Sequence, residues 1–100
     1  NPMGRSYVTG FGSNPSKNPH HRFWAHQEAE VFPEAPPGCL VGGPNSGLQD
    51  PIVDEAKLKG CAPERCYLDH NGAWSVNEIT INWNAPLAWL AYVLDEQIEH

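Results

Sequence analysis

The sequence has little positive charge and no long apolar run. It holds 6 Lys and Arg against 12 Asp and Glu, and a net charge of −6 argues against the basic face that nucleic acid requires. A membrane-spanning helix needs ~20 apolar residues, and the longest apolar run, Ala85 to Leu94, is far shorter. We therefore expect neither nucleic acid nor a membrane as a partner. No secretory leader is recognisable, and a start at Asn1 rather than Met is typical of a processed or excised piece.

Cysteine is scarce, and its odd count leaves at least one thiol unpaired within the chain. Cys61 and Cys66 can form a disulfide with Cys39 free, or Cys39 can pair with either of them. The same three cysteines and His70 also have spacing compatible with a zinc site, but paired C-x-x-C elements are missing, so a disulfide or buried thiols are favoured. Disulfides are compatible with a secreted protein.

The first two-thirds of the chain are rich in loop-forming residues. Most of the 9 Gly and 10 Pro lie there, so residues 1–74 are predicted to be mainly loop. Short helices are expected only over Phe23–Val31 and Ile52–Leu58. Such a long stretch without regular structure is rare in a compact domain, and is typical of functional loops or of a segment lying across a larger body.

The last segment has a helical pattern and is predicted to form one helix over about residues 75–99. Its apolar residues fall on nearly all faces, which is typical of a helix buried on every side. Pro86 removes one backbone donor and is expected to kink it. Since nothing else in a chain of 100 residues can wrap this helix, we expect it to pack in a larger helical body.

Two carboxylates, Asp69 and Glu78, lie at the start of this last segment among aromatic, amide and hydroxyl side chains. A pair of acids bordered by stacking rings suits the cleavage of glycosidic bonds. An inverting glycosidase uses one protonated acid at the leaving oxygen and one carboxylate about 6.5–9.5 Å away that activates water. The acid must keep its proton near neutral pH, which requires burial or a neighbouring negative charge.

Two long blocks carry a family resemblance. They are Ser6–Arg22 (SYVTGFGSNPSKNPHHR) and Tyr67–Ala85 (YLDHNGAWSVNEITINWNA), and between them lies Leu40–Gly47 (LVGGPNSG). In this order they resemble the signature regions of the family nine glycoside hydrolases. That resemblance covers nearly the whole chain. It implies an all-α fold, an (α/α)6 barrel of six helical hairpins, of which residues 1–100 are the C-terminal portion, with loops over 1–74 and the final helix over about 75–99.

The resemblance also implies an activity, the hydrolysis of β-1,4-glucosidic bonds in cellulose with inversion, as an endoglucanase. Glu78 falls on the family's general acid and Asp69 on an active-site position that orients or tunes the site. His20 and Arg22 fall on groups that line the subsite next to the cleaved bond. The expected partners are cellulose or β-glucan oligosaccharides and the remainder of the catalytic module, in the same or another chain.

The expected location is extracellular. No cofactor or metal is expected in the chemistry, although the full module can carry structural calcium. Among the aromatic residues, Trp74 and Tyr67 are candidates for substrate contact, while Trp83 and Trp89 have the helical spacing of core residues.

Simpler interpretations exist for each polar residue. Ser75 and Glu78 have the spacing of a capping box at a helix start, Asp69 suits the turn that follows it, and His20–Arg22 suits a solvated loop. The family's catalytic base, an Asp in an early Asp-Ala-Gly-Asp motif, is absent from this chain. The isolated chain is therefore expected to be inactive, and the alternatives are a non-catalytic sugar-binding fragment or a structural piece that completes a barrel.

Overall fold

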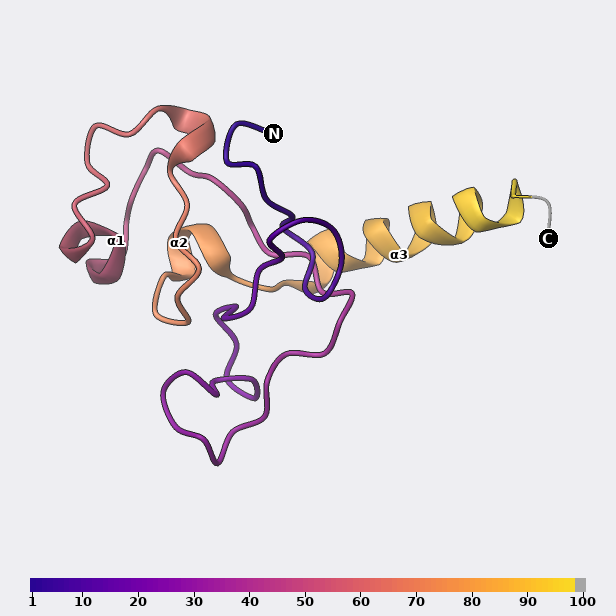
Figure 1. Cartoon of the computed structure of the whole chain (residues 1–100), viewed down its shortest axis with the longest axis horizontal. Coiled ribbons are helices and arrows are strands. Elements are labelled where there is room, and N and C mark those ends of the chain that lie inside the picture. Colours follow the sequence, from indigo (N-terminus) through magenta and orange to yellow (C-terminus); the bar gives the residue numbers. More distant parts are fainter. Residues whose placement is uncertain (99–100) are drawn as a thin grey trace.

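The structure is a computed structural model that describes residues 1–98. Its elements are α1 (Pro51–Glu55), the short 3-10 helix η1 (Pro63–Arg65), α2 (Trp74–Asn77) and α3 (Ile81–Glu96). Within residues 1–98 there is no β-strand, only isolated bridges between loop segments. Figure 1 shows a loop-rich body that holds α1 and α2, from which α3 extends to one side. The regular structure is helical, as predicted.

A small core holds the loops around α1 and α2. Its buried members are Val41, Val53, Tyr67, Ala73 and Val76. Val53 comes from α1 and Val76 from α2, so these two short helices contribute their inward faces to one apolar cluster. Short helices are marginal without such tertiary packing. The core therefore fixes the place where the chain runs from α2 toward α3.

Of the two short helices expected in the loop region, only the second forms. α1 starts because Pro51 suits the first helical position and the Asp50 carboxylate accepts a hydrogen bond from the Val53 amide at 2.9 Å. The prediction of a helix over Phe23–Val31 is wrong. Only the amides of Glu28 and Ala29 bond back to Ala25, which gives a single turn.

The prediction of one helix over 75–99 is also wrong at its start. α2 ends at Asn77, and Glu78 and Thr80 have extended backbone with ψ near 142° and 154° before α3 begins. Hydrogen bonds to distant loops hold this break, because the Glu78 carbonyl accepts from the Gly42 amide at 3.0 Å. Residue 99, in the predicted helix, lies outside the described residues.

The capping box predicted for Ser75 and Glu78 does not form. Ala73, not Ser75, precedes the first residue of α2, and no side chain caps that end. Both the amide and the hydroxyl of Ser75 donate instead to the Asp50 carboxylate. Glu78 follows the last turn of α2, so it does not lie at the positive end of a helix dipole.

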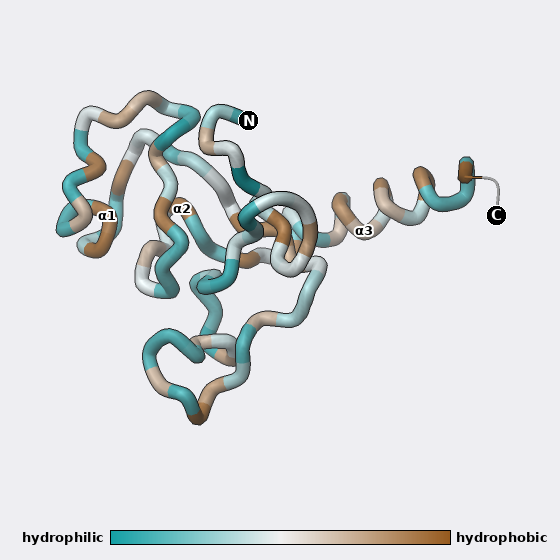
Figure 2. The backbone as a smooth tube through the Cα atoms, viewed as in Figure 1, coloured by the Kyte–Doolittle hydropathy of each residue, from teal (hydrophilic) through white to brown (hydrophobic). Residues whose placement is uncertain are grey.

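α3 contacts the loops near its start, where the Asn84 side chain accepts from the Leu40 amide at 2.8 Å and donates to the Leu40 carbonyl at 3.0 Å, but most of its surface is uncovered. None of its residues is buried, and it continues as one helix through Pro86. Figure 2 shows apolar residues along the whole projecting helix, and large side chains such as Trp89 and Tyr92 are more than half exposed. Among residues 1–98 no helix is long and apolar enough to cross a membrane. The prediction that another part of a helical body covers α3 stays a prediction.

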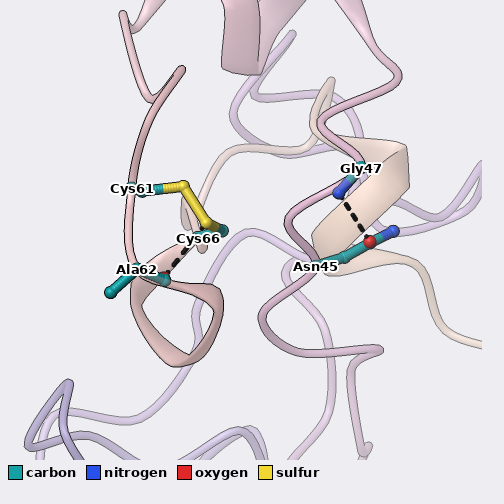
Figure 3. The surroundings of a disulfide bond; sticks show 5 residues. All are labelled: Asn45, Gly47, Cys61, Ala62 and Cys66. Carbon is teal, nitrogen blue, oxygen red and sulfur yellow. Dashed lines mark hydrogen bonds between the residues drawn. A yellow bond between two sulfur atoms is a disulfide. The ribbon is translucent and has the colours of Figure 1, made fainter.

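Cys61 and Cys66 form a disulfide that closes the short loop around η1, as Figure 3 shows, and Cys39 is free. This selects one of the pairings that the sequence left open. A zinc site built on the three cysteines and His70 is wrong, since two of those sulfur atoms are bonded to each other.

Replacing Cys61 and Cys66 together by Ser should lower the free energy of unfolding by about 2 kcal/mol, the chain-entropy value for so short a loop. The measurement is denaturant unfolding without reductant, with Cys39→Ser as the matched control. An unchanged unfolding midpoint in the double variant would show that this crosslink contributes nothing.

Candidate active site

The two principal site candidates, His20 and Glu78, are brought together although 58 positions separate them in the chain (78 − 20). They pair in an isolated parallel bridge. The His20 amide donates to the Asn77 carbonyl at 2.8 Å, and the Ile79 amide donates to the His20 carbonyl at 3.5 Å. Adjacent extended segments lie about 4.8 Å apart, and paired residues project to the same face. Both side chains therefore belong to one surface.

The ring of His20 is oriented by the second signature block. Its Nδ1 lies 2.5 Å from the Asn71 carbonyl oxygen. A carbonyl only accepts, so Nδ1 carries a proton, and in the tautomer with its single proton on Nδ1 the ring has Nε2 as an acceptor. The Asn71 amide in turn donates to the Gln27 side chain at 2.8 Å, which ties the loop after Arg22 to the same point.

A hollow opens beside His20. It is lined by His21, Arg22, Phe23, Ala25, Glu28, Phe32 and Asn71 as well as His20. The His21 ring stacks on Trp24 with centroids 4.3 Å apart, which stiffens the loop that carries Arg22. Aromatic faces, a guanidinium and a carboxylate in one hollow form a surface suited to a polar ligand with apolar faces, such as a pyranose.

Arg22, Trp74 and Glu78 are all exposed side chains. Arg22 lines the hollow with His20, whereas Glu78 and Trp74 lie outside its lining. Trp74, at the first position of α2, is 42% exposed. The structure thus leaves these three groups available, and their predicted roles remain to be tested. The expectation that Glu78 starts a buried helix is wrong, because it lies exposed in the break between α2 and α3.

Asp69 faces protein groups, not the hollow. Its carboxylate accepts from the Lys17 amide at 2.9 Å and the Asn18 amide at 2.8 Å, and Arg5 lies 3.4 Å away. With both oxygens bonded, it fastens the loop that leads to His20. This arrangement is compatible with the orienting role that was one of its predicted functions, which stays a prediction.

The prediction that Tyr67 contacts substrate is wrong. Its side chain is 3% exposed and belongs to the core. The hydroxyl donates to the Asn77 side-chain carbonyl at 2.6 Å and lies 2.6 Å from the Ser16 hydroxyl. Burial raises the pKa of this phenol above its ordinary value, and the Ser16 hydrogen bond opposes that shift in part.

Two buried polar residues that sequence reasoning missed, Asn77 and Asp50, hold the site segment in place. Asn77 bonds to both signature blocks. Asp50 is 2% exposed and anchors the start of α1 and residue 75 of α2. Burial raises the pKa of Asp50, but hydrogen bonds from Ser75, Val53 and Ile52 outweigh it and hold the pKa below its ordinary value.

In the described part of the chain, no group of three or more His, Cys, Asp or Glu side chains could hold a metal ion. The polar groups near His20 are instead bonded to backbone amides and carbonyls. Chemically, the arrangement offers an exposed carboxyl group on a segment paired with that of the oriented His20 imidazole, and a guanidinium, that of Arg22, which shares the hollow with His20.

Comparison with known proteins gives consistent matches. Residues 1–91 match the model of glycosyl hydrolase family 9. The chain is 52% identical over 96 residues to a cellulose 1,4-beta-cellobiosidase of Acetivibrio thermocellus, covering 96% of this chain and 11% of that protein. It is 46% identical over 99 residues to endoglucanase C of Cellulomonas fimi, covering 97% of this chain and 9% of that protein.

A solved structure agrees as well. AaCel9A in complex with cellobiose-like isofagomine superposes with a TM-score of 0.78 at 41% identity, over 95% of this chain and 17% of that one. The chain thus spans between 9% and 17% of the length of these relatives. The all-α architecture is that of part of the family's six-hairpin barrel. With the family model matched over nine-tenths of its residues, the chain belongs to glycosyl hydrolase family 9.

Proposed function

We propose that this chain supplies the general acid and part of the substrate site of an inverting endo-β-1,4-glucanase, with Glu78 as the acid. The observation that carries the proposal is the bridge that sets Glu78 beside His20 on one face. Membership of the family and the names of the relatives support the substrate class, since one is a cellobiosidase and another an endoglucanase.

In this role the Glu78 carboxyl donates its proton to the glycosidic oxygen as the bond to the leaving sugar breaks. Because a general acid keeps its proton through burial or a neighbouring negative charge, the remainder of the module must enclose Glu78, which is exposed in this chain. His20 accepts a hydrogen bond from a sugar hydroxyl at Nε2, because Nδ1 is committed to the Asn71 carbonyl. Arg22 donates to hydroxyls through its planar fork. Asp69 holds the loop that bears both groups, through the amides of residues 17 and 18.

The carboxylate that activates water comes from another part of the catalytic module, because the Asp-Ala-Gly-Asp motif is not in this sequence. Such a base would face Glu78 across the sugar at about 6.5–9.5 Å.

A chimera tests the proposal. In it, this chain replaces the aligned residues of Cellulomonas fimi endoglucanase C, to which it is 46% identical. We expect the chimera to hydrolyse cellulose and to lower the viscosity of soluble carboxymethyl cellulose, as internal cleavage does. NMR of the first products should show the α-anomer. A folded chimera that binds cello-oligosaccharides without cleaving them would favour the sugar-binding alternative and contradict the proposal.

We also propose that the protein acts outside the cell. The Cys61–Cys66 disulfide supports this, since such bonds persist mainly in oxidising compartments. Trapping thiols by alkylation at the moment of lysis tests it, because a protein from a reducing compartment would have all three cysteines modified.

A further inference from the structure

Asn77 is the most completely bonded buried polar side chain next to the proposed acid. It has no exposed surface. Its amide nitrogen donates to the Asn18 carbonyl at 2.6 Å and to the His70 carbonyl at 3.2 Å. Its side-chain oxygen accepts from the Tyr67 hydroxyl at 2.6 Å. Both donor hydrogens and the acceptor are therefore used inside the protein.

These bonds join the two segments that carry the site. Asn77 directly precedes Glu78, and Asn18 lies two positions before His20. The backbone carbonyl of Asn77 also accepts the His20 amide at 2.8 Å. One residue thus connects to the His20 segment through both its main chain and its side chain. By contrast, the bond from the Ile79 amide to the His20 carbonyl is long, at 3.5 Å.

A second layer braces Asn77 itself. The Tyr67 hydroxyl donates its only hydrogen bond to the Asn77 side-chain oxygen. The Ser16 hydroxyl, 2.6 Å away, must therefore be the donor in its hydrogen bond with Tyr67. Ser16 lies in the same loop whose next two amides bind Asp69. The hydrogen bonds that link Ser16, Tyr67 and Asn77 therefore fix the position of the His20 loop relative to α2. Hydrogen-bonded networks of this kind, when every member is satisfied, specify a single arrangement.

We propose that Asn77 is a positioning residue that sets the Glu78 carboxyl at its working distance from the sugar held by His20. This inference rests on the function proposed above. Asn77 touches no reacting atom. It acts by preventing the segment 77–79 from sliding along the segment 18–20. Proton donation tolerates little displacement, and a misplacement of about 1 Å can cost about 100-fold in rate.

The test compares two substrates in the chimera. Cellulose needs a proton on its leaving oxygen, whereas 2,4-dinitrophenyl β-cellobioside releases 2,4-dinitrophenolate, a stable anion that departs without being protonated. For Asn77→Ala we expect kcat on cellulose to fall by about 100-fold with KM little changed. Turnover of the dinitrophenyl substrate should stay within about threefold of the parent, since its departure does not depend on the acid.

Tyr67→Phe is the milder second variant, which keeps the ring in the core and removes only the hydroxyl. The loss of one neutral hydrogen bond should reduce cellulose turnover by about fivefold. We expect this loss, too, to be absent with the dinitrophenyl substrate. Val53→Ala, a buried change in α1 away from the site, is the control for lost stability and should leave the ratio of the two activities unchanged.

Equal losses on both substrates in Tyr67→Phe and Asn77→Ala, or no loss on either, would overturn the inference, because a purely structural residue changes only the amount of folded enzyme. If Asn77→Ala yields no folded protein, the ratio in Tyr67→Phe decides alone. The Glu78→Gln variant distinguishes the proposed acid role of Glu78 from the positioning role of Asn77. If Glu78→Gln shows the substrate dependence and the other two variants do not, the positioning role fails while the proposed function stands.

Discussion

Replacing Glu78 by Gln in the chimera should lower kcat on cellulose by about 100- to 10,000-fold, the usual contribution of a general acid. Gln keeps the size of the side chain and can still form hydrogen bonds, but its amide has no acidic proton to transfer to the leaving oxygen. Because Glu78 is exposed and follows the end of α2, its replacement removes no core contact. The free energy of unfolding should therefore change by less than about 0.5 kcal/mol.

Initial rates of reducing-sugar release, together with thermal unfolding, measure these two effects. Glu64→Gln is the matched control, since Glu64 is an exposed glutamate on η1. We expect that variant to keep full activity. Cellulose turnover within a few-fold of the parent in Glu78→Gln would remove Glu78 from the reaction, whatever the family membership of the chain.

The largest expected effect on stability comes from Asp50. Replacing Asp50 by Ala removes the acceptor for the Val53 amide at the start of α1 and for the Ser75 amide on α2. A helix cap is worth about 1 kcal/mol, and hydrogen bonds to a buried charge about 1.5–3 kcal/mol. We expect a loss of about 3 kcal/mol in the chimera, against less than about 0.5 kcal/mol for the exposed Glu55→Ala control.

The effect of Asp50 should depend on pH. Its folded pKa lies below the ordinary value, so the folded state favours the ionised carboxylate. The stabilisation is fully present above the unfolded pKa of about 3.9 and is lost as the pH falls through the folded pKa. The difference in melting temperature between parent and Asp50→Ala should accordingly be constant from pH 5 to 7 and shrink below pH 4. A difference independent of pH would mean that charge is not what Asp50 contributes.

The helical end of the chain was predictable over most of its length, but not at its start. Apolar spacing located the residues that became α3. The pattern Ser75-x-x-Glu78 looked like a local helix start because capping boxes depend only on neighbours in sequence. The observed break depends on Gly42 and His20, whose backbone groups bond to residues 78 and 79. Bonds to such distant partners leave no local sequence signal.

The signature blocks predicted which residues lie near one another, while the roles of these residues stay predictions. His20 and Glu78 do meet, and Arg22 does share a hollow with His20. Tyr67 is a candidate for substrate contact from the sequence because it is an aromatic residue in the second signature block. Its burial follows from partners in the other block, Ser16 and Asn77. The sequence does not predict the role of Asn77, because an asparagine in a polar run carries no signal that its side-chain amide will be buried in the folded protein.

The helix expected at Phe23–Val31 failed for a related reason. A modest apolar pattern supported it, but Gln27 uses its side chain to hold the Asn71 amide, and the His26 ring lies 2.8 Å from the Phe32 carbonyl. These contacts replace the regular backbone ladder after a single turn. Local propensity is a weak prior where tertiary contacts of this kind compete.

The loop between Phe23 and Pro37 leaves and rejoins the body at braced points. Before it, the His20 amide is bonded to Asn77, and after it the Gly38 amide donates to the Thr9 carbonyl at 2.7 Å. Surface loops between fixed ends accept changes of length readily. The stretch between these ends can therefore vary in length while both ends stay in place, and because part of it lines the hollow beside His20, such variation would reshape that hollow. Gln27, whose side chain accepts from the Asn71 amide at 2.8 Å, is the position that such a change should keep.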